Sequence, residues 1–213
     1  MPPLNLVGDY GGGSLYLIVG ILAALHEAKR SGEGQVVDAA MTDGVISLMS
    51  NFVSHARRGL FKEERGSNLL DGGAPYYRTF ETADGQYVSL GAIEPQFFKD
   101  LCERVGLPTS LHGSQGDRAR WPDMHTEFER IFRSKTRDEW VALLEGTDVC
   151  FAPVLPLSEV PSHPHNLARQ AFVDVDGVSH PAPAPRFSRT PSAIQGPTPA
   201  EAVAAQSVKA RWA

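Results

Sequence analysis

The hydrophobic residues near the start of the chain form one long apolar run. It extends from Leu15 to Leu25, and polar residues follow it up to Arg30. Ser14 directly precedes the run and is a favourable N-cap, so the pattern predicts a helix from about residue 14 to residue 30. The run is shorter than the ~20 apolar residues that span a bilayer, and it lacks the basic start of a signal peptide. We therefore expect a buried helix and no membrane partner.

The segment that follows predicts a strand, a helix and a linker. Residues 31–34, Ser-Gly-Glu-Gly, break the chain, and residues 35–37, Gln-Val-Val, are typical of a short buried strand. Apolar spacing predicts a second helix from about residue 39 to residue 55. Between residues 57 and 73 the composition becomes polar and rich in glycine, which favours a linker.

A different pattern begins at Pro75. Polar and apolar residues alternate over 76–92 around Ala83-Asp84-Gly85, which predicts a β-hairpin. An amphipathic helix follows and ends at Gly106. Two more helices are predicted in the stretches MHTEFERIFRSK and TRDEWVALLEG, and the second begins with a capping box of Thr136 and Glu139. VCFAPVLP predicts a further strand.

These elements predict an α/β protein in three parts, residues 1–72, 73–156 and 157–213. The first part has two helices and one strand, although an α/β layer needs several strands. We therefore expect that the beginning of the fold is missing from this chain. Proline is frequent after Pro156, so we expect the last part to form turns and one or two strands that pack back on the first part.

Composition limits the classes of partner. The chain has 213 residues, of which 42% are hydrophobic and 21% charged, as in soluble globular proteins. Its net charge of −5 gives no indication of a nucleic-acid partner. The two cysteines, Cys102 and Cys150, lie far apart and in no metal-binding spacing. They predict free thiols, and we expect Cys150 to be buried as a small hydrophobic residue.

Asp9, directly before the apolar helix, is the candidate for chemistry. It precedes Tyr10 and the glycines at positions 11–13. From the residues alone, it fits a turn or cap acid as well as an acid/base group at a helix N-terminus, where backbone amides stabilise an oxyanion. A phosphate loop is disfavoured, because no G-x-x-x-x-G-K-[ST] motif is present and an acid would repel phosphate.

Four long motifs, in this order, resemble the acyl-CoA racemases of the family III CoA-transferase superfamily. They are PLNLVGDYGGGSLYLIVGILAAL, GEGQVVDAAMTDG, LDGGAPYYRTFETADGQYVSLGAIEPQFF and EGTDVCFAPVLPLSEVPSHPHN. The resemblance implies that residues 1–72 are part of a large, Rossmann-like CoA-binding domain. It also implies that residues 73–156 form a small α+β domain, and that residues 157–213 return to the large domain.

The resemblance also implies site residues. Asp9 matches one of two bases that act at the α-carbon of the substrate, and Glu94 matches a supporting active-site residue. From the residues alone, Glu94 fits equally well an acid at the start of a helix, before Pro95. The implied substrate-binding residues are Gly11, Gly12, Asp71, Gly72 and Tyr76, although Asp71 also fits a turn and Tyr76 a core aromatic.

The implied reaction is inversion of the 2-methyl centre of an acyl-CoA thioester through an enolate. CoA is part of the substrate, and no metal or other cofactor is implied. One alternative is CoA transfer with Asp9 as the nucleophile, and another is a remnant without catalytic activity. The second base of these racemases is a histidine that precedes the aspartate, and none of the seven histidines here matches it. We therefore expect a fragment with impaired activity.

Assembly and location are expected from the same resemblance and from the C-terminus. Members of the family form interlocked dimers with the active site between domains of two subunits, so we expect a homodimer. The last four residues, Ala210-Arg211-Trp212-Ala213, are not a peroxisomal signal, and we expect a cytoplasmic protein.

Overall fold

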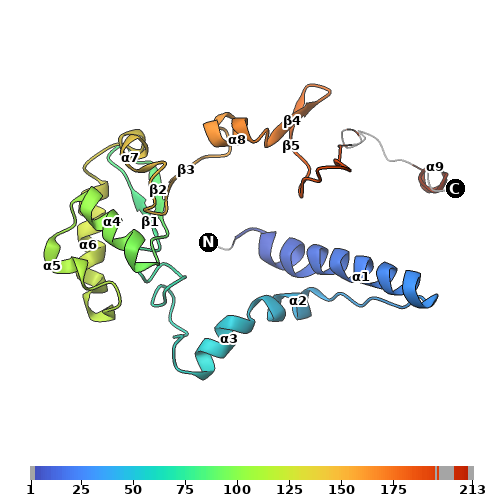
Figure 1. Ribbon diagram of the computed structural model, residues 1–213, viewed down its shortest axis with the longest axis horizontal. Coiled ribbons are helices and arrows are strands. Elements are labelled where there is room, and N and C mark those ends of the chain that lie inside the picture. The colour runs from blue at the N-terminus through green and yellow to red at the C-terminus, as the bar shows by residue number, and fades with distance from the viewer. Residues whose placement is uncertain (1–2, 195, 197–203, 211–213) are drawn as a thin grey trace.

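The computed structural model describes residues 3–194, 196 and 204–210, and Figure 1 shows its elements in an open C-shaped arrangement. A group of helices and short strands from the middle of the chain forms one side. The N-terminal helices and the C-terminal segment extend away from it. Residues 211–213, on which the expected location partly depends, lie outside the described residues.

The first helix begins earlier than the sequence predicts. A π-helical segment, η1 (Leu6–Leu15), continues without a break into α1 (Tyr16–Ser31), which ends at Gly32 in the left-handed conformation. Ser14 therefore lies inside a helix, and its prediction as an N-cap is wrong. π-Helical turns are rare and often occur at functional sites, and this one contains Asp9.

The glycines of η1 allow a second helix to approach closely. A Cβ atom on Gly12 would lie 2.7 Å from the Val45 side chain and 2.9 Å from its backbone nitrogen. Gly44 meets the backbone of Gly12 in the same way. Both positions therefore need glycine, because a side chain would push the two helices apart. The close partner of this glycine run is a helix, α2 (Met41–Leu48).

The segment between the two helices is not a strand. Residues 33–40 are extended but have no strand assignment, and Val36 is 94% exposed. The prediction of a buried strand over 35–37 is wrong, because no described strand lies beside it to complete its hydrogen bonds. The predicted second helix is divided at Met49 into α2 and α3 (Ser50–Arg57).

The small domain is built on a three-stranded antiparallel sheet. β1 (Thr79–Glu81) and β2 (Tyr87–Leu90) form the predicted hairpin, with Phe80 opposite Val88. β2 also pairs with β3 (Phe151–Val154), so that the order is β1-β2-β3. The strands at 76–92 and 149–156 are therefore confirmed, and the mixed helix and sheet agree with the α/β class.

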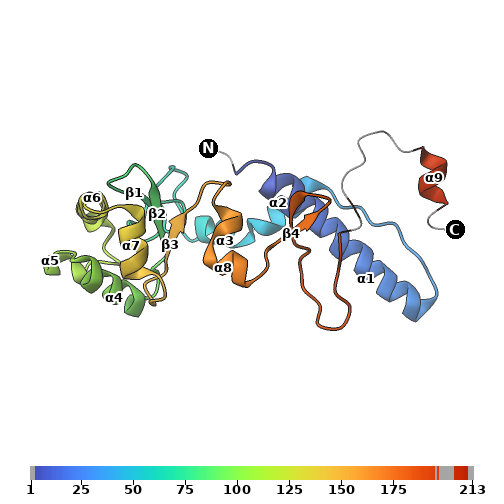
Figure 2. The same ribbon diagram turned by 90° about the horizontal axis from the view of Figure 1, so that it is seen from above.

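Helices cover the side of this sheet that faces away from α1 and α2 (Figures 1 and 2). They are α4 (Pro95–Val105), α5 (Thr109–His112), η2 (Arg118–Arg120), α6 (Trp121–Phe132) and α7 (Arg137–Leu144). The predicted C-cap at Gly106 and the capping box of Thr136 and Glu139 are both present.

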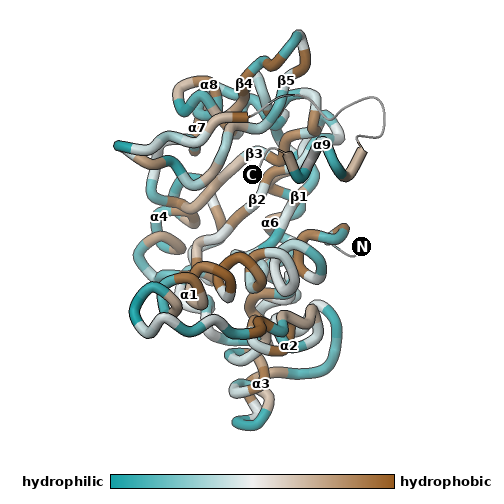
Figure 3. Tube along the Cα trace, turned by 90° about the vertical axis from the view of Figure 1, so that its right-hand side faces the viewer, coloured by the Kyte–Doolittle hydropathy of each residue, from teal (hydrophilic) through white to brown (hydrophobic). Residues whose placement is uncertain are grey.

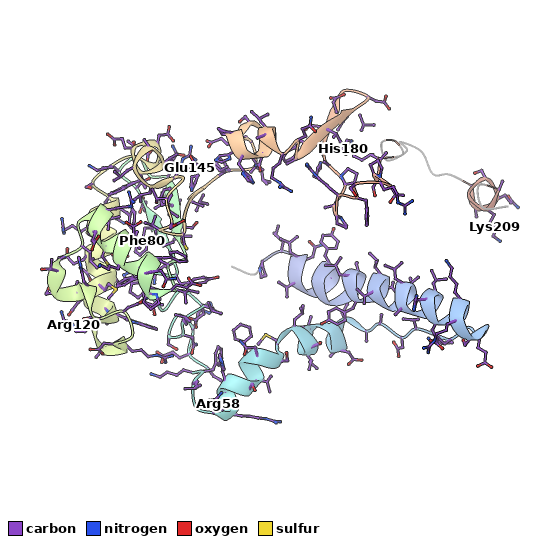
Figure 4. The ribbon with its side chains drawn as sticks, viewed as in Figure 1. Arg58, Phe80, Arg120, Glu145, His180 and Lys209 are labelled. Carbon is purple, nitrogen blue, oxygen red and sulfur yellow. The ribbon has the colours of Figure 1, made fainter. Side chains whose placement is uncertain are left out.

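Aromatic side chains fill the core between helices and sheet. Phe132 is fully buried, and its ring stacks 5.3 Å from Phe80 and lies 5.0 Å from Trp140. Figure 4 shows side chains crowded around Phe80, in contrast to the sparse layer around α1. Among the described residues, the buried members of this hydrophobic core all lie between Ala74 and Val149. The division of the chain at residues 72 and 156 stays a prediction.

A buried cation, Arg137, holds the last part of the chain to the small domain, and Nε2 of His163 also lies 3.7 Å from a carboxylate oxygen of Glu145. The guanidinium of Arg137 pairs with Glu159 at 2.8 Å, next to η3 (Val160–Ser162). Beyond it lie α8 (Pro164–Ala168), a hairpin of β4 (Phe172–Val175) with β5 (Val178–Pro181), and α9 (Ala205–Lys209). The chain thus runs back above α1 in Figure 1.

The first helix leaves its apolar side chains uncovered. No residue of α1 is buried, and Figure 3 colours many of its turns brown, as hydrophobic. The combined helix, Leu6–Ser31, is 26 residues long and contains an 18-residue stretch with a mean hydropathy of 1.4, enough to cross a membrane by length and composition. Core helices of globular proteins pass the same test, so the absence of a membrane partner stays a prediction.

Candidate functional site

Glu94 lies where the small-domain sheet passes into a helix. The chain leaves β2 at Leu90, and Glu94 is the N-cap of α4, with Pro95 in the first helical turn. Its side chain is exposed and makes no capping hydrogen bond. Within the described residues it has no hydrogen-bond or ion-pair partner. The helix-start position is therefore confirmed, but the carboxylate remains available to a ligand.

A cavity of about 700 Å³, most of whose lining residues are polar, reaches as far as Gly91 in this part of the chain, and Glu94 itself does not line it. Gly91, three residues before Glu94, lines it, and so do the side chains of Tyr77, Arg78 and Ser89. Cys150 lies in the same wall, and its backbone carbonyl accepts from the Gly91 N–H at 2.8 Å. The cavity therefore brings together residues from the first linker, the hairpin and the start of β3.

The charge of Glu94 affects the pKa of Cys150, which lines this cavity. Cys150 is exposed, so the expectation that it is buried is wrong. Partial desolvation raises the pKa of its thiol, and the negative charges of Glu94 and Asp148 raise it further. Cys102 is the buried thiol, and burial raises its pKa to about 12. Both cysteines are free, as predicted.

Asp71 and Gly72 line the cavity, and Asp71 also holds its own loop. The two Asp71 carboxylate oxygens accept from the Asn68 backbone and side chain, both at 2.8 Å, and from the Gly73 N–H at 3.1 Å. Desolvation acts to raise the pKa of Asp71, but these hydrogen bonds outweigh it and lower the pKa. Gly72 has a φ of +87° and its carbonyl accepts from Arg78. The turn that the residues alone indicated is therefore present.

Tyr76 lies in the core and not on the cavity. It is 4% exposed, its ring contacts Phe98 and Trp121 edge to face, and burial raises its pKa. Tyr76 is thus the core aromatic that the residues alone also indicated, and its assignment to substrate binding stays a prediction. Tyr77, the next residue of this turn, lines the cavity instead.

The structure does not bring Asp9 and Glu94 into contact. Asp9 is exposed in the first turn of η1, so the burial expected of an acid/base group is absent here. Figure 1 shows this end of the helix directed toward the small domain. Gly11 and Gly12 lie beside α2, where Gly12 is buried. Their contacts here are helix packing, and their assignment to substrate binding stays a prediction.

A second, apolar cavity of about 470 Å³ was missed from the sequence. Its walls come from α3 and from the stretch that the sequence predicts as a polar linker. The Phe52 and Phe61 rings meet edge to face at 6.0 Å, and Asp71 borders this cavity as well as the polar one. The lining residues are Met49, Phe52, His55, Leu60, Phe61, Asn68, Leu69, Leu70, Asp71 and Arg118. The helical spacing of Met49 and Phe52 was the available signal.

No group of three or more metal-ligating side chains occurs in the part of the chain that the structure describes. The arrangement instead offers a free carboxylate, a polar cavity and an apolar cavity. Such a site suits a substrate with a polar reacting group and an apolar body, because few polar groups in an apolar setting orient a ligand.

Known proteins resemble this chain over most of its length. Residues 2–202 match the model of CoA-transferase family III. Alpha-methylacyl-CoA racemase from Mus musculus is 46% identical over 192 residues, and that from Homo sapiens is 42% identical over 192 residues. These alignments cover 90% and 89% of this chain, and 50% of each racemase. The chain therefore spans about half the length of these relatives.

The fold is shared with solved structures. The crystal structure of Rv3272 from Mycobacterium tuberculosis superposes with a TM-score of 0.69 at 23% identity. The match covers 92% of this chain and 51% of that protein. Together with the family match over residues 2–202, this agrees with the fold that the motifs imply. The chain belongs to CoA-transferase family III.

Proposed function

We propose that this chain takes part in the isomerisation of 2-methylacyl-CoA thioesters, inverting the configuration at C2. The racemases that it resembles, at 42–46% identity, carry this activity in their name, and the family match over residues 2–202 includes Asp9 and Glu94. The observation that carries the proposal is the Glu94 carboxylate, unpaired among the described residues and held at a helix start three residues after Gly91, which lines the polar cavity.

The proposed reaction moves one proton off C2 and one proton back. Asp9 accepts the proton, and the electron pair of the broken C–H bond moves into the thioester as an enolate. For inversion, a second acid on the opposite face gives a proton to C2, and the electron pair of the enolate forms the new C–H bond; no residue of this chain is assigned to that acid. Asp9 is assigned this role from the family motif, and its exposed side chain is able to reach a ligand. Glu94 supports the reaction from the small domain.

The start of α4 offers a way to stabilise the enolate. Because Glu94 makes no side-chain cap and Pro95 has no N–H, the first backbone N–H groups of the helix, at Gln96 and Phe97, have no intrahelical acceptor. Such N–H groups and the helix dipole favour a developing oxyanion.

The two cavities match the two ends of such a substrate. We propose that the thioester lies toward the polar cavity and the acyl chain in the apolar cavity, with Asp71 at their boundary. Asp71 then acts by keeping the shape of the boundary, since its carboxylate is already occupied by three donors.

Assembly and location belong to the same proposal. We propose a homodimer in the cytoplasm, with CoA entering only as part of the substrate and no metal or redox cofactor. The exposed apolar side chains of α1, such as Ile18, Val19 and Leu22, support association, because monomeric proteins rarely leave a patch of this kind uncovered.

Deuterium uptake tests the proposal. The purified chain is incubated with a 2-methylacyl-CoA in D₂O, and deuterium at C2 is measured by mass spectrometry while chiral analysis reports inversion. We expect deuterium uptake that falls by roughly 10²-fold or more in Asp9→Asn, as for loss of a general base. Glu94→Gln should lower it by a smaller factor.

Two controls keep this result specific. Glu27→Gln in α1 and Glu103→Gln in α4 make the same acid-to-amide change at exposed positions of the same helices, and should leave uptake unchanged. CoA transfer would appear instead as a mixed anhydride at Asp9, formed when its oxygen attacks the thioester carbonyl and CoA leaves as a thiolate. Hydroxylamine trapping at Asp9 without deuterium uptake would therefore replace the proposal by transfer.

A further inference from the structure

Gln115 holds the segment that ends at Glu94. Its side-chain amide nitrogen donates to the carbonyl oxygens of Ala92 at 3.1 Å and Ile93 at 2.8 Å. These two carbonyls belong to the residues directly before Glu94. Gln115 itself comes from the loop between α5 and η2, more than twenty residues later in the chain.

The same segment is fixed from its other side by backbone hydrogen bonds. The Gly91 N–H donates to Cys150 at 2.8 Å, and the Ala92 N–H donates to Tyr76 at 3.1 Å. Ala92 is fully buried, so the segment has little room to move. Gln115 therefore donates to the carbonyls of Ala92 and Ile93, which, in the described part of the chain, receive no hydrogen bond from the sheet or from α4.

Gln115 is itself held from α6. The indole N–H of Trp121 donates to the backbone carbonyl of Gln115 at 2.9 Å. The Trp121 ring also lies edge to face with Tyr76 at 6.1 Å. One hydrogen bond thus connects the core to this loop, and two more connect the loop to Ala92 and Ile93, directly before Glu94. Because Gln115 is held by the core and bonds to the residues before Glu94, it fixes the position of Glu94 relative to the core.

We propose that Gln115 is a positioning residue, which sets the place of the Glu94 carboxylate through the carbonyls of Ala92 and Ile93. It touches no substrate. Its effect on the reaction rests on the proposed function, whereas its hold on the segment does not. Without its two donors, the buried carbonyls lose their partners and the residues before Glu94 gain freedom.

Two substitutions test the N–H donors of Gln115 separately from the volume of its side chain. Gln115→Met keeps the length of the side chain without a donor, and Gln115→Glu keeps its shape but places an ionised carboxylate against the carbonyls. Gln86→Met is the matched control, because Gln86 belongs to the same domain and donates only to Asp84 on the exposed hairpin.

Two readouts are measured on the full chain. Amide hydrogen exchange at Gly91 and Ala92 should become faster in Gln115→Met and faster still in Gln115→Glu, with the melting transition still cooperative. Deuterium uptake at C2 should fall about tenfold or more in kcat with KM nearly unchanged, because misplacing an active-site group costs rate more than binding. Gln86→Met should change neither.

The outcomes distinguish this inference from the proposed function. If the unaltered chain takes up deuterium and Gln115→Met matches it in kcat, the positioning role is wrong. If the unaltered chain takes up no deuterium, the proposed function fails, and amide exchange alone decides whether Gln115 holds the segment. Unchanged exchange at Gly91 and Ala92 in both variants would overturn the inference in either case.

Discussion

The small domain and the N-terminal helices use similar residues in opposite ways. Between Ala74 and Val149, apolar side chains meet one another, and Phe132 contacts three other aromatic rings. Along α1, apolar side chains are just as frequent, yet none is buried. The small domain is therefore stabilised by side-chain packing, whereas the N-terminal helices meet mainly through the backbones of Gly12 and Gly44.

This difference also divides the candidate site. Glu94 is attached to a packed domain, and its position follows from a core that the chain completes by itself. Asp9 is attached to a helix whose apolar surface is uncovered. We expect the geometry of Glu94 to be robust and that of Asp9 to depend on what covers this helix.

The largest expected effect is loss of a core ring. Phe132→Ala should lower the free energy of unfolding by about 3–5 kcal/mol, because it removes a fully buried aromatic ring and leaves a cavity. Leu22→Ala removes an α1 side chain that is 61% exposed in the single chain, and in the monomer it should change this free energy by no more than about 0.5 kcal/mol. Urea denaturation at concentrations where the chain is monomeric measures both. Equal losses in the monomer would show that α1 is buried within one chain and would remove the contrast.

A smaller effect is expected at the glycine contact between η1 and α2. In Gly44→Ala, the new methyl group would collide with the Gly12 carbonyl, and we expect a cost of about 1–3 kcal/mol, as for overpacking. Amide exchange over Met41–Leu48 should become faster. Gly34→Ala is the control, since no atom lies near its added Cβ. If both variants exchange alike, the two helices are not held by this contact.

The smallest expected effect is a pH response at the boundary between the regions. The pKa of Asp71 is lower in the folded chain than its ordinary value of 3.8, so its contribution to stability is present above that value. The contribution is lost as the pH falls through the lower, folded-state pKa. We expect amide exchange at Asn68 and Gly73, corrected for intrinsic rates, to accelerate in this acid range. Asp71→Asn should show no such pH dependence, and an equal dependence in both would contradict this role.

The small domain was predictable because its local signals agree with its packing. The alternation over 76–92 predicts the hairpin, and Thr136 and Glu139 form the capping box that their spacing indicates. Gly106 ends α4 in the left-handed conformation, as a C-terminal glycine does. Each of these features depends on neighbours within a few residues, so a single sequence contains the information.

The N-terminal part was less predictable because its decisive contact is distant in sequence. The glycines at 11–13 resemble a loop locally, and they become helical where Gly12 packs against Gly44. Val36 and Val37 resemble a strand but have no described strand beside them. Glu94 was found through family motifs, whereas the hold by Gln115 and the cavity at Phe52 required coordinates, because they join separate segments.

The central claim is that Asp9 and Glu94, from these two different regions, act on one substrate. A double-mutant cycle of deuterium uptake at C2 tests it most directly, with Asp9→Asn, Glu94→Gln and the double variant compared with the unaltered chain. We predict that the double variant is little slower than Asp9→Asn alone, since residues that act as a unit are strongly non-additive. Losses that simply multiply would show that the two carboxylates act independently and would contradict the account.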